Sequence, residues 1–449
     1  MSVLDLIFTT DAMRAVFADR ARVQRMLDFE AALARAEAAS GVIPAASAAA
    51  IADSCNADLF DFAELAARAR DAGNLAIPLV SKLTARVAAA APDARGHVHW
   101  GATSQDVIDT GLVLQINDAL ALIDADLRRF ADALAAQASA HRATTLAGRT
   151  WMQQALPVTL GLKLAMTLNA VDRHLERLAA VRVRVAMLQF GGAAGTLASL
   201  GAQGLVVERA LAAELGLAVS ATPWHTQRDN LCEVAAVLGM IVATCGKLAR
   251  DVSLLAQTEV GEALEPTAPG RGGSSTLPHK RNPVGSATAL AAAVRVPGLV
   301  ATMLAAAVQE HERGLGDWPA EWDTLPDIAM LAAGALDAMA NVVAGLEVDA
   351  ARMLANLDLT QGLILAEAVQ MALAPVLGRG TAHELVAAAS KRAVATHRHL
   401  RDVLWDEQRV RDVLQRDALA LLFDPQSYLG STDAFIARAL DRHPRADKS

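Results

Sequence analysis

The chain has 449 residues, of which 53% are hydrophobic and 20% charged, a balance that excludes a disordered polypeptide. The net charge of -8 and the lack of any long basic run argue against nucleic acid as a partner. Cys55, Cys232 and Cys245 lack the spacing of a disulfide scaffold or a thiolate zinc site, so we expect a reducing, cytoplasmic environment.

Helical periodicity dominates the chain. Only 4% of residues are aromatic, and the apolar content is mostly Ala, Leu and Val, which favours an all-α fold. The first clear amphipathic helix spans 17–40. Three long helices are expected in the middle of the chain, over 157–188, 228–262 and 284–312. The first of these opens at Pro157 and the last is bent at Pro297. Their lengths predict an elongated helical bundle, and no alternating pattern indicates a strand.

The pattern of breaks predicts three parts. We expect an N-terminal helical domain over 1–106, a central long-helix bundle over 107–350 and a C-terminal helical domain over 351–449. The uncharged stretch 185–207 is long enough to span a membrane. Its glycines and polar side chains instead predict a buried break between helices, so no membrane partner is expected.

Several kinds of site are excluded by spacing. No glycine-rich loop follows a strand in the manner of a nucleotide site, and no GxSxG elbow is present. The histidine pairs His97/His99 and His397/His399 lack a third ligand at suitable spacing, so no metal site is expected.

The longest irregular stretch, 263–283, is a candidate catalytic loop. Ser274 and Ser275 follow three glycines, and Lys280 and Asn282 come six and eight residues after Ser274. A serine on a glycine-rich loop can be brought to a substrate and shielded when the loop closes. Lysine and asparagine side chains can bind and polarise a carboxylate. The alternative is a polar surface loop with positive charge.

A second cluster precedes a predicted helix over 107–120. His99, Thr103 and Ser104 are suited to anion binding at its start, and Asp106 is expected to cap it. A simple capping turn is the alternative reading. Two more polar clusters, 148–157 and 224–229, lie just before long helices.

These segments carry a family resemblance. Residues 273–283 read GSSTLPHKRNP and resemble the signature loop of the fumarase/aspartase superfamily, with Leu277 in place of Met. The TSxD, GRT and GGAAGT segments at 103–106, 148–150 and 191–196 match the superfamily in the expected order. The resemblance implies a mostly helical three-part subunit, a homotetramer whose active sites draw loops from three subunits, and no cofactor.

The resemblance also implies chemistry beside a carboxylate, through a resonance-stabilised aci-carboxylate. It implies that Ser274 is the carbon-side base, and that Lys280 and Asn282 hold substrate carboxylates. Trp151 departs from the GRTH of lyases that release fumarate, in which the histidine is linked to protonation of the leaving group. An amine leaves poorly without a proton, whereas a carboxylate has a conjugate-acid pKa near ~4 and leaves readily.

One reaction of the superfamily fits that departure, the lactonisation of 3-carboxy-cis,cis-muconate to 4-carboxymuconolactone in protocatechuate breakdown. The segments 148–159, 309–322 and 424–430 resemble the bacterial enzymes of this branch. A fumarate-releasing lyase of the adenylosuccinate type is the alternative, and a catalytically silent helical scaffold is a third reading.

For the lactonisation we expect a small tricarboxylate substrate. Its charges would be held by Thr103, Ser104, Ser275, Lys280, Asn282 and, more weakly, Arg281. Lys280 would also lower the pKa of the Ser274 hydroxyl, and Trp151 would shape the pocket as an apolar wall. His99 and His141 are expected to act as hydrogen-bonding groups near the substrate.

Overall fold

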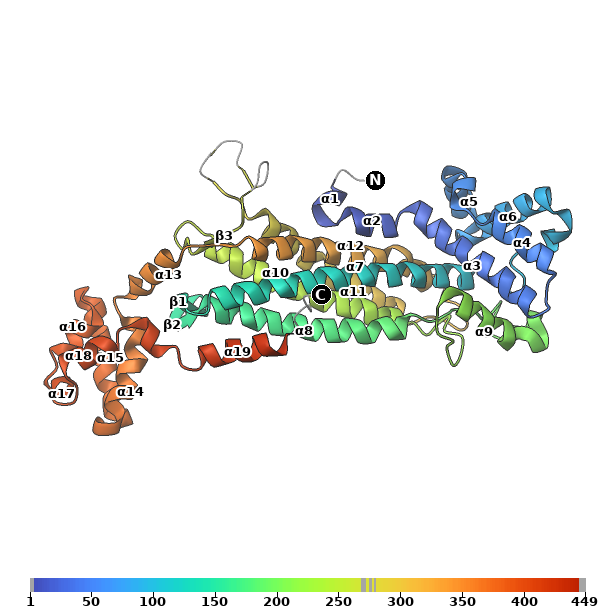
Figure 1. Ribbon diagram of the computed structural model, residues 1–449. Coiled ribbons are helices and arrows are strands. Elements are labelled where there is room, and N and C mark those ends of the chain that lie inside the picture. Colours follow the sequence, from blue (N-terminus) through green and yellow to red (C-terminus); the bar gives the residue numbers. More distant parts are fainter. Residues whose placement is uncertain (1–3, 268–271, 274–276, 278–279, 444–449) are drawn as a thin grey trace. The chain divides into compact units, whose positions relative to one another are not determined.

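The computed structural model describes residues 4–267, 272, 273, 277 and 280–443, and its regular structure is almost entirely helical (Figure 1). The expected all-α fold is confirmed. Two compact units are present. The first comprises Met1–Leu127, His174–Gly246 and Thr288–Asp337, and the second Arg128–Arg173, Lys247–Ala287 and Ala338–Ser449. The division at 106 and 350 stays a prediction.

The helices formed by the N-terminal residues belong to the first unit. These are α1 (Asp5–Phe8), α2 (Asp11–Val16), α3 (Asp19–Ala39), α4 (Ala45–Ser54), α5 (Phe62–Ala72) and α6 (Ala76–Ala90). The helix α9 (Gly204–Leu215) packs with α4 against α3. The predicted helix over 17–40 is therefore α3, with Val23, Met26 and Leu27 buried on one face as its periodicity indicates.

Five long helices contribute residues to both units. They are α7 (Ser104–Ala140), α8 (Leu160–Val185), α10 (Asp229–Leu255), α11 (Val284–Ala306) and α12 (Asp317–Ala344). Within the first unit, α10 and α11 approach closely: a Cβ added at Gly246 would lie 2.6 Å from the Cβ of Ala293. That separation requires glycine here and agrees with the small-residue packing expected from composition.

The sequence pattern predicted no strands, and this prediction was wrong. A two-stranded antiparallel hairpin joins α7 to α8, with β1 (Thr145–Thr150) paired to β2 (Gln153–Thr159). Pro157 therefore lies in β2, opposite Ala147, and α8 begins three residues later than expected. A two-stranded sheet has only edge strands, where proline is tolerated because no neighbouring strand needs its missing N–H.

Shorter helices fill the rest of the second unit, as expected for the C-terminal third. They are α13 (Ala350–Leu357), α14 (Ala366–Leu377), α15 (Arg379–Thr396), α16 (Leu400–Trp405), α17 (Gln408–Arg411), α18 (Arg416–Leu421) and α19 (Thr432–Arg442). Leu373, Leu385 and Leu404 belong to a core formed by α14 to α18. A small ladder joins β3 (Ala263–Leu264) to β4 (Glu347–Val348).

Three of the long helices, α10, α11 and α12, meet the length and hydropathy of a membrane span. Of the most apolar window in each helix, 61% is buried in α10 and 67% in α12, but only 28% in α11. The apolar surfaces of α10 and α12 are thus explained mainly by packing inside the chain. The stretch 185–207 forms a glycine-rich break followed by the start of α9, as expected.

Candidate active site

The first group of candidate residues surrounds the start of α7. The helix begins at Ser104, earlier than expected, so Asp106 lies in its first turn and not at its cap. The Asp106 Oδ2 accepts a hydrogen bond from the backbone N–H of Thr103 at 3.0 Å. This bond is one of the two that make up a capping box, in which the side chain of the third helical residue accepts from the backbone N–H of the N-cap residue.

The same carboxylate joins two other loops to α7. Asp106 Oδ1 accepts from Gly191 N at 3.0 Å and lies 2.8 Å from Nε2 of His225, and Oδ2 accepts from Gly192 N at 2.9 Å. Gly192 has a φ of +69°, and a Cβ there would meet the Gly101 carbonyl at 2.9 Å, so both conformation and space require glycine. Two of the four polar clusters identified in the sequence, 99–106 and 224–229, therefore meet in the first unit, together with the glycine-rich break at 191–196.

Arg313 was not predicted as a site residue. It lies on the segment between α11 and α12 and donates to Gln105 Oε1 at 2.9 Å, Ala193 O at 3.2 Å and Thr103 Oγ1 at 3.3 Å. All three acceptors are neutral, and the described residues provide no carboxylate that neutralises the guanidinium. Arg313 therefore places an unneutralised cation beside Thr103. The segment 309–322 carried a resemblance in the sequence but no role for Arg313, because its three acceptors lie 120 to 210 residues away in the sequence.

A buried ionic cluster lies on the next turn of α7. The Arg228 guanidinium is fully buried and donates to Asp109 at 2.7 and 3.1 Å and to Glu321 at 2.5 to 3.0 Å. Asp109 also accepts from Trp318 Nε1 at 2.9 Å. Burial raises the pKa of the Glu321 carboxyl although its bonds to Arg228 oppose the change. This network fixes α7, α10 and α12 relative to one another at the site.

His99 lies five residues before the start of α7 and is bonded to a residue of α3. Its Nδ1 lies 2.6 Å from Oε1 of the buried Glu30. The residue has a φ of +58°, in the left-handed region that non-glycine residues seldom adopt. Of the residues predicted from the sequence, Thr103 thus contacts Arg313, Ser104 follows it at the start of α7, and His99 is fixed by Glu30.

The second group of candidate residues belongs to the second unit. Ser274 and Ser275 lie outside the described residues. Lys280, Arg281 and Asn282 line a cavity of about 210 Å³ together with Leu264, Glu265 and Pro283.

Arg281 is fixed within this loop by two acceptors. It donates to Glu347 Oε2 at 2.8 Å and to the Glu265 carbonyl at 2.5 Å, and its bond to Glu347 lowers the pKa of that carboxyl. Lys280, by contrast, is exposed. The Glu265 carboxylate accepts from the amides of Gly285 and Ser286 at 2.9 and 2.7 Å, and so anchors the loop to α11. Of the two cations, Lys280 is the better placed to meet a ligand.

Trp151 occupies the tip of the β1–β2 hairpin. Trp151 and Met152 form its two-residue turn, both with positive φ, and are 96% and 71% exposed. Asn-Gly is typical of such a turn because both positions are left-handed. Beside it, Arg149 forms a two-bond ion pair with the buried Glu262 at 2.7 and 2.9 Å. The hairpin is thus anchored close to its turn by Arg149 and exposes an indole at its tip.

His141 also lies in the second unit, with Nδ1 3.1 Å from the Thr144 hydroxyl. Burial lowers its pKa, so the neutral imidazole is favoured. The described residues contain no group of three His, Cys, Asp or Glu side chains arranged to hold a metal ion.

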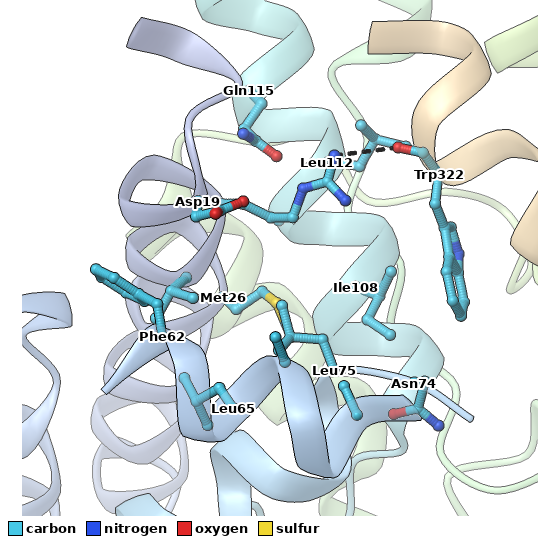
Figure 2. A pocket seen from close by; sticks show the side chains of 15 residues that line it. Asp19, Met26, Phe62, Leu65, Asn74, Leu75, Ile108, Leu112, Gln115 and Trp322 are labelled. Atoms are coloured by element: carbon cyan, nitrogen blue, oxygen red, sulfur yellow. Dashed lines mark hydrogen bonds between the residues drawn. The ribbon is translucent and has the colours of Figure 1, made fainter. Parts of the chain in front are cut away.

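A separate cavity of about 290 Å³ is lined by residues of α3, α5 and α7 (Figure 2). Its walls are mostly apolar, and Arg22, which donates to the Trp322 carbonyl at 3.2 Å, is the one cation among its lining residues. None of the predicted site residues lines it. A tricarboxylate needs several cations, so this cavity does not suit the predicted substrate.

The chain is similar to known proteins over nearly its whole length. The sequence matches the family described as "Lyase" over residues 7–298 and that described as "Adenylosuccinate lyase C-terminus" over residues 362–439. A 3-carboxy-cis,cis-muconate cycloisomerase of Pseudomonas aeruginosa is 57% identical over 98% of this chain and 96% of its own length. One from Pseudomonas putida is 55% identical over 93% of this chain and 99% of its own. The crystal structure of 3-carboxy-cis,cis-muconate lactonizing enzyme from Pseudomonas putida superposes with a TM-score of 0.94 at 54% identity, covering 98% of each chain.

Proposed function

The chain belongs to the lyase family of the fumarase/aspartase superfamily, and from that premise we propose that it is a cycloisomerase that converts 3-carboxy-cis,cis-muconate to 4-carboxymuconolactone. The observation that carries the proposal is Trp151. An exposed indole stands at the hairpin tip where fumarate-releasing members carry the histidine linked to leaving-group protonation. Relatives with the proposed activity are similar over nearly the whole chain, so the adenylosuccinate-type alternative is not favoured.

The chemistry needs one bond to form and one proton to be placed. A carboxylate oxygen of the substrate adds to its own double bond, and the electron pair moves into the neighbouring carboxylate as an aci-carboxylate. Ser274 then protonates carbon and regains its proton from solvent, so the reaction takes up one proton and releases no group. Because the nucleophile is part of the substrate, correct positioning removes much of the entropic barrier.

The remaining candidates act on the negative charge of the substrate. Lys280, Asn282, Ser275 and the backbone of the signature loop bind the carboxylate that becomes the aci-carboxylate, where charge builds up. Thr103 and Ser104 bind a second carboxylate, and the unneutralised guanidinium of Arg313 beside them supports this assignment. Arg281 contributes less because Glu347 already pairs with it. Trp151 forms an apolar wall.

The enzyme acts as a homotetramer in the cytoplasm, with loops from three subunits in each site and no cofactor. Two features support the assembly. The most apolar window of α11 is only 28% buried, and Val294 and Leu304 on that helix are 80% and 56% exposed. The hairpin tip likewise presents Trp151 to its surroundings. Apolar surface of this extent on a helix is typical of an interface between subunits.

The test is an ultraviolet assay with 3-carboxy-cis,cis-muconate, without added cofactor or metal. Loss of the conjugated diene, with a lactone identified by NMR, is the expected result. Ser274→Ala should lower kcat by orders of magnitude while size-exclusion chromatography shows the same assembly. A stable diene with well-folded protein refutes the proposal and directs the search to succinyl compounds that release fumarate. Full activity of Ser274→Ala refutes the assignment of the base.

A further inference from the structure

Glu30 is a buried carboxylate with a single hydrogen-bond partner. Its side chain is fully buried on α3, and Oε1 lies 2.6 Å from Nδ1 of His99. Among the described residues, its other oxygen, Oε2, has no partner. A buried charge without a counter-charge costs several kcal/mol, so Glu30 depends on His99 to neutralise it.

His99 in turn is held in one position by this bond. Its left-handed backbone is strained and is retained only where the surroundings fix it. With Nδ1 bonded to Glu30, Nε2 is the ring nitrogen left for a ligand, and within the described part of the chain it has no acceptor. The imidazole is 17% exposed and lies four residues before Thr103.

We propose that Glu30 is a positioning residue that keeps His99 doubly protonated, so that its Nε2–H binds a substrate carboxylate beside Thr103 and Ser104. The inference rests on the proposed function, which places His99 at the tricarboxylate. Glu30 itself does not touch the substrate. By keeping His99 protonated, Glu30 adds a second cation to the anion-binding part of the site. The first is Arg313, which contacts Thr103 from the segment between α11 and α12.

The charges around His99 support the protonated form. Burial alone lowers the pKa of His99, but the charge of Glu30, the hydrogen bond to it and the charge of Asp106 together raise the pKa above its ordinary value. Asp106 faces His99 from α7 and is itself bonded to amides and His225. Glu30 also acts on Glu37, which lies on the same helix, because its charge adds to the burial that raises the pKa of Glu37.

Glu37 provides a matched control on the same helix. It is buried like Glu30, two turns further along α3, and neither of its carboxyl oxygens has a partner among the described residues. Burial, followed by the charge of Glu30, raises its pKa to about 9, so it is uncharged near neutral pH. Glu37→Gln therefore removes no charge, whereas Glu30→Gln removes a negative charge from an equally buried position.

The experiment measures the titration of His99 and the activity in the same variants. In protein carrying ¹³C-labelled histidine, with the His99 resonance assigned from His99→Gln, Glu30→Gln should lower the pKa of His99, because the charge and the hydrogen bond that raise it are lost. The upper apparent pKa of the kcat/KM profile should move to lower pH by the same amount. KM should rise by a larger factor than the factor by which kcat falls. Glu37→Gln should leave both curves unchanged.

A double variant separates positioning from a general structural effect. If Glu30 acts through His99, adding Glu30→Gln to His99→Gln should not change kcat/KM further. An unchanged His99 titration in Glu30→Gln overturns the inference, as does a further loss of activity in the double variant. If the wild-type protein does not convert 3-carboxy-cis,cis-muconate, the proposed function fails, while the titration alone still decides whether Glu30 keeps His99 charged.

Discussion

Replacement of Glu37 by glutamine should stabilise the protein at neutral pH. The carboxyl of Glu37 is fully buried, and its pKa of about 9 lies well above the ordinary 4.5. At pH 7 the unfolded chain ionises this group while the folded chain keeps it protonated. The difference of about 2.5 units between pH 7 and the pKa of 4.5 in the unfolded chain corresponds to a free energy of roughly 3 kcal/mol that opposes folding. Glutamine has nearly the same shape and no such penalty.

The sign of the pH dependence makes the assay specific. Because the folded pKa is raised, the folded state binds the extra proton between pH 4.5 and about 9. The contribution of Glu37 is therefore favourable at low pH and is lost as pH rises, by about 1.4 kcal/mol per unit.

Urea unfolding of wild type and Glu37→Gln, at one protein concentration, should give a stability difference that grows by about 3 kcal/mol between about pH 5.5 and pH 8. Glu384→Gln, an exposed change on α15, should show no growing difference. Parallel curves for wild type and Glu37→Gln would show that the carboxyl is ionised in the folded chain, and the reasoning would be refuted.

Two further variants test local features of the fold. Met152→Gly should raise the melting temperature slightly, because a left-handed non-glycine residue costs about 1–2 kcal/mol and glycine removes that strain. Met152→Ala keeps the strain, and equal effects of Gly and Ala would contradict the argument. Arg228→Met should lower the free energy of unfolding by about 3–5 kcal/mol, since it leaves Asp109 and Glu321 buried without their cation. Arg184→Met breaks an exposed pair with Glu233, and a urea titration should show a loss below about 1 kcal/mol.

Local periodicity was sufficient to predict the all-α class and the position of α3, but α7 was predicted only over 107–120 and α12 was not predicted. The buried stripe of α3 repeats every three to four residues, so its limits were predicted to within two residues. The β1–β2 hairpin was missed because its strands pair only with each other and show no clean alternation. Its turn carries Trp151 and Met152, where hairpin signals rely on glycine and asparagine.

The site was predictable only as far as its motifs reached. The segments around Ser104 and Lys280 were identified because their residue types suit anion binding and resemble a known family. Glu30 and Arg313 gave no such signal. Glu30 lies 69 residues from His99, and Arg313 lies 210 residues from Thr103, and no local pattern relates residues at such separations. Buried partners of this kind follow from tertiary packing.

The sharing of Asp106 has a consequence for local opening of the fold. The amides of Thr103, Gly191 and Gly192 all donate to one carboxylate, although they belong to two segments far apart in the sequence. When the first turn of α7 frays, all three amides lose their acceptor in the same event. Their exchange with deuterated solvent should therefore follow one common rate under conditions where opening is in equilibrium. We therefore expect the start of α7 and the glycine-rich break after α8 to open as one cooperative unit.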